Sequence, residues 1–163
     1  MLLDEDLIIT GKVIDKGITD ASNMGAAMAP AAYHTLLAHF EDTGLPPSYY
    51  DLIVTGDLGR LGKEIVVDLF RQDGIDLSPN YEDCGVLLFD PNTQDVHAGG
   101  SGCGCSAIVL TGYLLRELRR GRWSRLLFCG TGALHSPTAT MQGESIPGIC
   151  HAVSIAAPSG GVS

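Results

Sequence analysis

Residues 99–107, with the sequence GGSGCGCSA, combine four glycines and two thiols just before an apolar run. Glycine lacks a Cβ, so a loop of this kind lets its backbone come close to a neighbouring group or a ligand. The apolar run predicts a helix over residues 106–120, whose free N–H groups and positive dipole end would point back at the loop. Because such a place favours an anion or a developing oxyanion, the loop is the first candidate for a site.

The two thiols of this loop leave several chemistries open. A cysteine at a helix N-terminus can be a nucleophile because the dipole lowers the pKa of a thiol, and His97 is the nearest base in the sequence. Cys103 and Cys105 could instead bind a metal with His97 and His135, although the one-residue spacing and the lack of a second cysteine pair disfavour zinc. The plain alternative is that both thiols are small residues filling a tight turn.

The glycines do not match the common nucleotide-binding motifs. Their spacing differs from GxGxxG, and no acidic residue follows about twenty positions later at a predicted strand end. A P-loop is also disfavoured, because no Gly-Lys-Ser or Gly-Lys-Thr follows.

A second candidate lies in the turn Thr55-Gly56-Asp57-Leu58-Gly59, directly after a predicted buried strand. In α/β proteins the carboxyl ends of parallel strands are where ligand groups are placed. Asp57 could therefore line a binding site, and the alternative is that it caps the following helix.

The elements that must position these residues follow from the hydrophobic pattern. Strands are predicted at residues 7–14, 51–55, 85–89, 125–130 and 149–155, and helices at 23–41, 58–74 and 106–120. This order predicts an α/β fold with a mostly parallel, mixed five-stranded sheet and helices on both faces. We expect one domain over residues 1–157 and a flexible tail at 158–163.

The predicted helix that follows the glycine loop is apolar around most of its circumference between Ala107 and Leu118. Such a helix is normally buried on all sides. In a chain this short, a partner chain or a missing half of the protein must then cover it.

Composition and charge restrict the classes of partner. A net charge of −9 over 163 residues disfavours nucleic acid, because there is no basic stripe to follow a phosphate backbone. The arginines at positions 116, 119, 120, 122 and 125 lie at the C-terminal end of a predicted helix. They are expected to complement the helix dipole, and a weaker alternative is contact with acidic lipid headgroups or an acidic partner.

The start of the chain, MLLDED, lacks the cationic and apolar regions of a signal peptide, and no stretch is long and apolar enough for a membrane span. The five cysteines are an odd number without a CxxC pair, so we expect reduced thiols in a cytoplasmic compartment.

Four segments resemble the stage V sporulation protein AD family. They are MGAAMAPAA at 24–32, DLIVTGDLG at 51–59, QDVHA with the following glycine loop from 94, and QGESIPG at 142–148. The resemblance extends from about residue 7 to residue 155.

This resemblance implies a thiolase-like fold, in which two α/β halves enclose a shared layer of helices, and this chain resembles the second half. In such enzymes the second half supplies a catalytic histidine and an asparagine or second histidine. Here the corresponding turn is Gly56-Asp57 and the corresponding loop is Gly102-Cys103-Gly104. The resemblance therefore implies no catalytic residue, no cofactor and no Claisen chemistry.

The resemblance also implies a function, which is non-catalytic binding and transport of dipicolinic acid during spore formation and germination. The expected binding residues are Gly56, Asp57, His97, Ser101, Cys103 and Cys105, with loop N–H groups as anion donors and no metal held by the protein alone. The ligand could arrive as its calcium chelate, which would lower its negative charge. The alternatives are an acyltransferase or thiolase with Cys103 or Cys105 as nucleophile, and a structural module of a membrane-associated complex.

The implied partners are other membrane proteins of the stage V sporulation A complex, together with a second copy of the chain or the missing first half. The implied location is cytoplasmic, peripheral at the forespore or spore inner membrane.

Overall fold

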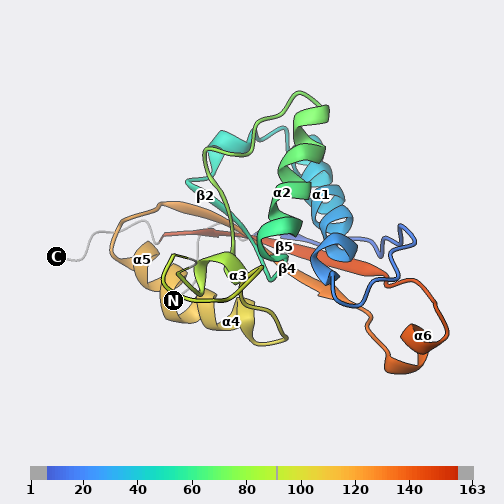
Figure 1. The fold of residues 1–163 in the computed structure, drawn as a ribbon. Helices are drawn as coiled ribbons and strands as arrows, with labels where there is room; N and C mark the ends of the chain where they lie inside the picture. The colour runs from blue at the N-terminus through green and yellow to red at the C-terminus, as the bar shows by residue number, and fades with distance from the viewer. Residues whose placement is uncertain (1–6, 91, 158–163) are drawn as a thin grey trace.

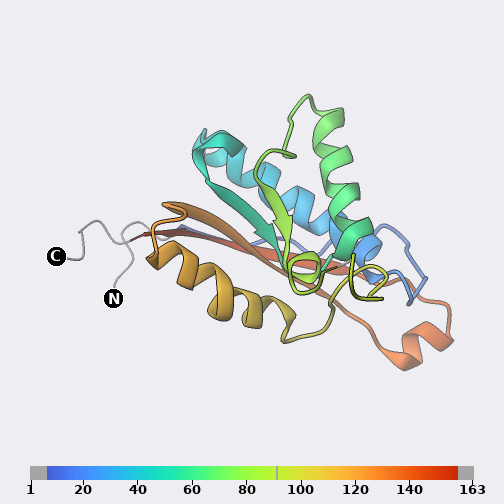
Figure 2. The same ribbon diagram turned by 60° about the vertical axis from the view of Figure 1, so that its left-hand side comes forward.

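The computed structural model describes residues 7–90 and 92–157, so the predicted tail at 158–163 lies outside the described residues. Its centre is a five-stranded sheet in the order β1-β5-β4-β2-β3, with helices on both faces (Figures 1 and 2). The strands are β1 (Ile8–Ile9), β2 (Leu52–Thr55), β3 (Tyr81–Asp83), β4 (Arg125–Ala133) and β5 (Gly148–Ala156). β5 pairs antiparallel with β1 and β4, whereas β2 pairs parallel with β3 and β4. Four strands thus share one direction, which confirms the predicted α/β class.

One face of the sheet is covered by α1 (Met24–Thr43) and α2 (Gly59–Gln72), as Figure 2 shows. Local capping interactions set both ends of α1. The Asn23 side chain accepts a hydrogen bond from the Ala26 N–H, and Gly44 ends the helix in the left-handed region at φ 68°. The predicted ranges 23–41 and 58–74 are therefore confirmed to within about two residues.

The other face carries one continuous helical segment made of α4 (Cys105–Val109), the π-helical turn η2 (Leu110–Leu114) and α5 (Leu115–Arg119). Its buried residues are Cys105, Val109, Leu114 and Leu118. The buried residues Val109 and Leu114 are five positions apart, and in a regular α-helix residues at that spacing do not point to the same side. The π turn accommodates the extra residue, so that Val109 and Leu114 both face the sheet.

The outer side of this segment is exposed rather than enclosed. Ala107, Thr111 and Gly112 are exposed, and the Ile108 side chain is 60% exposed. The helix therefore buries one side only within the part of the chain that the structure describes. No helix in that part has the length and apolar character needed to cross a membrane.

Two predicted strands are corrected by the structure. The strand predicted at 85–89 is wrong: β3 lies earlier, and residues Cys84–Leu87 form the helical turn α3. Asp83 causes the change of direction, since its side chain accepts a hydrogen bond from the Gly85 N–H and caps α3. The strand predicted at 7–14 is reduced to β1 and a single bridge from Ile14 to Gly148.

The connection between β4 and β5 contains the short helix α6 (Pro137–Met141). A 3₁₀ turn, η1 (Pro47–Tyr49), precedes β2.

Candidate functional site

A buried aspartate organises the carboxyl ends of β2 and β3. Asp83 is fully buried, and its carboxylate accepts four hydrogen bonds. The donors are the Thr55 hydroxyl at 2.8 Å and the N–H groups of Leu58, Gly59 and Gly85 at 3.0, 2.9 and 2.9 Å. Asp83 thus joins the end of β2, the start of α2 and the start of α3. Burial raises the pKa of this carboxyl, and the four donors oppose the shift.

Asp83 was not among the predicted site residues. The signal that could have found it is the capping position itself, an aspartate two positions before a glycine. The expected strand at 85–89 concealed this signal because it placed Asp83 in a loop.

Asp57 holds the glycine loop against the sheet. Its Oδ2 accepts hydrogen bonds from the Gly102 N–H at 3.0 Å and the Ser101 hydroxyl at 3.3 Å. Its Oδ1 accepts from the Thr131 hydroxyl at 3.2 Å, and the Asp57 N–H donates to the same hydroxyl at 3.1 Å. The structure therefore brings Asp57 and Ser101 together, and it adds Thr131 of β4, which the sequence did not indicate.

The alternative that Asp57 caps α2 is wrong. Leu58 occupies the cap position and makes no side-chain capping bond, while Asp83 accepts from the first N–H groups of this helix. Because the Gly102 N–H is engaged by Asp57, it is also not free to bind an anion in this arrangement.

The glycine loop fits closely against α3 and α2. The Gly100 N–H donates to the Gly85 carbonyl at 2.7 Å, and the Arg60 N–H donates to the Ala98 carbonyl at 2.8 Å. Gly99 has φ 113°, and a Cβ at this position would lie 2.5 Å from the Gly85 oxygen. Glycine is therefore required at Gly99 both for its backbone conformation and for its close approach to α3.

A hollow of about 330 Å³ lies between this loop and the N-terminal end of α1. Loop residues 98–101, the turn at 57–59 and the α1 start at 21–25 surround it, together with Leu61. Asp57 is its one ionisable lining residue among those that the structure describes, and Ser22, Asn23 and Ser101 supply neutral polar groups. Because α1 has twenty residues, its dipole also adds positive potential at this end.

Of the remaining predicted site residues, some lie beside Asp57 and others are exposed away from it. Cys105 is buried, with its Sγ 3.9 Å from the Gly56 carbonyl oxygen, so Gly56 and Cys105 adjoin Asp57. His97 is not brought to the hollow: its side chain is 91% exposed, and its Nδ1 lies 3.9 Å from an oxygen of Asp95. Cys103 is an exposed thiol of the loop.

The thiol chemistry of Cys105 is opposite to the prediction from the helix dipole. Burial raises the pKa of Cys105, and the carboxylates of Asp57 and Asp83 raise it further. This thiol is therefore protonated near neutral pH, so Cys105 is not an activated nucleophile. Among the described residues, no group of three or more His, Cys, Asp or Glu side chains could hold a metal ion.

Alkylation tests the remaining nucleophile, Cys103. We expect iodoacetamide to label Cys103 in the folded chain no faster than it labels glutathione, because exposure alone gives no activation. The four buried thiols, Cys84, Cys105, Cys129 and Cys150, should react only after unfolding. Mass spectrometry of timed samples gives the rates, with Cys103→Ser as the control. Labelling far faster than that of glutathione would instead support a catalytic thiol.

Comparison with known proteins gives two matches. Residues 5–156 match the family model described as Stage V sporulation protein AD (SpoVAD). The chain is also similar to Stage V sporulation protein AD of Bacillus subtilis (strain 168), with 48% identity over 143 residues. That match covers 88% of this chain and 42% of the relative, so the chain spans less than half of the relative's length.

Proposed function

The chain belongs to the stage V sporulation protein AD family, and from this premise we propose that it is a non-catalytic binding component for dipicolinic acid in spore formation and germination. The observation that carries the proposal is the hollow between the glycine loop and α1. Its volume of about 330 Å³ lies within the range of small-molecule sites. Dipicolinic acid, pyridine-2,6-dicarboxylate, is a small planar dianion, and the α1 N-terminus favours negative charge.

The charge of the hollow favours the calcium chelate over the free dianion. Asp57 lines the hollow, and the described lining residues include no lysine, arginine or histidine. A free dianion would therefore meet a carboxylate without a compensating cation. Calcium prefers six to eight oxygen ligands, of which dipicolinate can supply only some. Oxygen atoms of Asp57 and Ser101 are then suitable further ligands for the chelate.

The same region supports a non-catalytic role. The turn expected to carry a catalytic imidazole holds Gly56 and Asp57, and Asp57 is engaged by Thr131, Ser101 and Gly102. His97 points to solvent, and Cys105 lies buried with a raised pKa. These groups do not form the nucleophile and base that acyl transfer requires.

Calorimetry tests both whether the chain binds dipicolinate and whether it binds the calcium chelate. We expect dipicolinate with calcium to give measurable heat, and Asp57→Asn to weaken the binding about 10- to 100-fold because it removes a charged ligand. Asp68→Asn is the matched control, since Asp68 is an exposed residue of α2 outside the hollow, and it should leave affinity unchanged. Equal affinity with and without calcium would exclude the calcium chelate as the bound form. No heat in either condition would exclude dipicolinate binding by this chain.

We further propose that the exposed side of α4 and η2 is covered in the assembled protein. A second copy of this chain, or the part of the protein that corresponds to the rest of the longer relative, would bury Ile108 and its neighbours. Sedimentation velocity on the calorimetry sample separates these: a dimer favours the second copy. We also propose that the chain is located at the spore inner membrane, beside other membrane proteins of the stage V sporulation A complex.

A further inference from the structure

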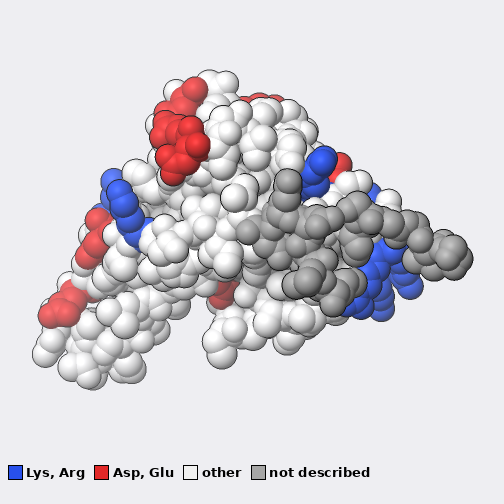
Figure 3. Space-filling model, turned by 180° about the vertical axis from the view of Figure 1, so that it is seen from behind, with Lys and Arg blue, Asp and Glu red and all other residues white. Residues whose placement is uncertain are grey.

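Half of the basic residues of this acidic chain lie at one end of the molecule. Five of its ten lysines and arginines fall within residues 116–125, where Glu117 is the one acidic residue. Figure 3 shows basic side chains gathered at the end of the molecule where α5 stops and β4 starts. We call this group the arginine end; its members, all exposed, are Arg116, Arg119, Arg120, Arg122 and Arg125.

Complementation of the helix dipole does not account for the whole group. α5 ends at Arg119, so Arg116 and Arg119 lie in its last turn. Arg122 lies beyond the helix, and Arg125 belongs to β4. Since the dipole effect fades within the last turn of a helix, these later arginines need another explanation.

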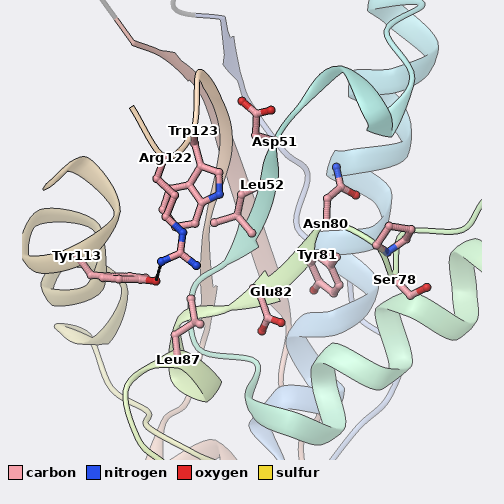
Figure 4. Close-up of a pocket in the computed structure, with 11 residues that line it drawn as sticks. Asp51, Leu52, Ser78, Asn80, Tyr81, Glu82, Leu87, Tyr113, Arg122 and Trp123 are labelled. Carbon is pink, nitrogen blue, oxygen red and sulfur yellow. Dashed lines mark hydrogen bonds between the residues drawn. The ribbon is translucent and has the colours of Figure 1, made fainter. Parts of the chain in front are cut away.

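Aromatic side chains hold part of the arginine end in place. The Arg122 guanidinium donates to the Tyr113 hydroxyl at 3.0 Å and lies 4.8 Å from the centre of the Trp123 ring (Figure 4). The Arg125 guanidinium lies 4.6 Å from the centre of the Tyr49 ring. These three rings are partly exposed. Arginine with tryptophan and tyrosine is the composition typical of surfaces that meet a bilayer interface.

Each described carboxylate near this end is bound to neighbouring groups. Glu117 pairs with Arg120 at 2.8 Å and Arg122 at 3.6 Å. Asp51 accepts from the N–H groups of Ser124 and Arg125 at 2.6 and 2.9 Å. A hollow of about 320 Å³ opens beside Arg122 and Trp123 (Figure 4). Its remaining carboxylate, Glu82, pairs with Lys63 at 2.8 Å. Among the described residues of this end, the five arginines face two carboxylates, Glu117 and Asp51, so positive charge is in excess there.

We propose that the arginine end is a docking surface for an anionic lipid bilayer. An acidic protein is the less favoured partner, because the group lies at an exposed end with aromatic rings between the cations. The proposal rests on the proposed location at the spore inner membrane for its setting, and it does not require dipicolinate binding. Each basic residue close to an anionic bilayer is expected to contribute about a fivefold increase in partitioning.

Vesicle cosedimentation tests this surface. The chain should bind vesicles of phosphatidylcholine mixed with phosphatidylglycerol, and should not bind vesicles of phosphatidylcholine alone. Among the described residues, Arg116 and Arg119 have no ion-pair partner, so the double variant Arg116→Gln/Arg119→Gln breaks no ion pair there. We expect it to lower partitioning about 25-fold. Raising the salt concentration should weaken binding of the unaltered chain because exposed charges are screened.

The matched control is Lys12→Gln/Lys16→Gln, which removes the same charge from exposed positions of the segment before α1 that form no ion pair with the described residues. It should change partitioning less than about threefold, and circular dichroism checks that both variants fold. Equal losses in the two double variants, equal binding to neutral vesicles, or no vesicle binding would each overturn the proposal. If vesicle binding is absent while calcium dipicolinate still gives heat, the docking surface fails and the proposed function stands.

Discussion

Asp83→Asn is expected to lower the free energy of unfolding by about 2–4 kcal/mol at neutral pH. Each carboxylate oxygen of Asp83 accepts two hydrogen bonds, and the side chain is fully buried. An amide presents one oxygen and one NH₂ group, so the NH₂ group would face N–H groups that have lost their acceptor. A buried donor left without a partner costs its full desolvation. Urea unfolding followed by circular dichroism measures the loss.

The matched control for this variant is Asp76→Asn. Asp76 also accepts from an N–H and a hydroxyl, both of Ser78, but it lies at an exposed turn. Asp76→Asn should lower the free energy of unfolding by less than about 1 kcal/mol, because water replaces the lost hydrogen bonds. Similar losses at the two positions would show that Asp83 does not organise the strand ends.

The contribution of Asp83 to the free energy of unfolding should also depend on pH. Burial raises the pKa of this carboxyl above its usual value near 3.8, so the folded protein holds the proton more tightly than the unfolded chain. The stabilisation linked to that proton is complete below about pH 4 and is lost as the pH rises through the folded value. The difference in unfolding free energy between the unaltered chain and Asp83→Asn should therefore narrow as the pH rises. A difference that grows would contradict the raised pKa.

Gly99→Ala is expected to cost about 3–5 kcal/mol, from two causes that a second variant can separate. Gly99 and Gly102 share the same backbone angle, φ 113°, which side chains rarely adopt. A Cβ at Gly99 would lie 2.5 Å from the Gly85 carbonyl oxygen, whereas a Cβ at Gly102 would meet no atom within 4 Å. Gly102→Ala therefore carries the backbone strain alone, about 1–3 kcal/mol.

Thermal unfolding of both alanine variants gives the two contributions. The excess loss at Gly99 measures how firmly the loop is pressed against α3, which fixes the wall of the hollow. If both variants lose the same stability, the close contact between the loop and α3 does not exist in solution. Calcium dipicolinate calorimetry on Gly99→Ala then shows whether the loop's position matters for binding.

Local signals in the sequence were sufficient for much of the fold. Asn23 and Gly44 set the ends of α1 through bonds to residues within four positions, and such short-range chemistry can be read directly. The apolar run of β2 predicted a buried strand, and all four of its residues are buried because the sheet is covered on both faces there. The apolar residues of β4 and β5 also predicted strands, although each of these two strands contains an exposed position. The segments that carry the family resemblance are also local. Gly56, Asp57, Ser101 and Cys105 could be named for the same reason, since they flank strand ends or start a helix.

Tertiary structure decided what depends on segments far apart in the chain. The hydrogen bonds of Asp83 come from residues 24 to 28 positions earlier as well as from Gly85, so no local pattern predicts that β3 ends there and α3 begins. The Thr131 contact to Asp57 joins residues 74 positions apart. His97 is close to the loop in sequence, yet its left-handed backbone at φ 47° and full exposure separate it from the hollow. The predicted helix end at residue 120 already left Arg122 and Arg125 beyond the helix, but only the structure showed the aromatic rings that these two arginines contact. A side chain's neighbours are set by the packing of distant segments, and sequence spacing alone does not contain that information.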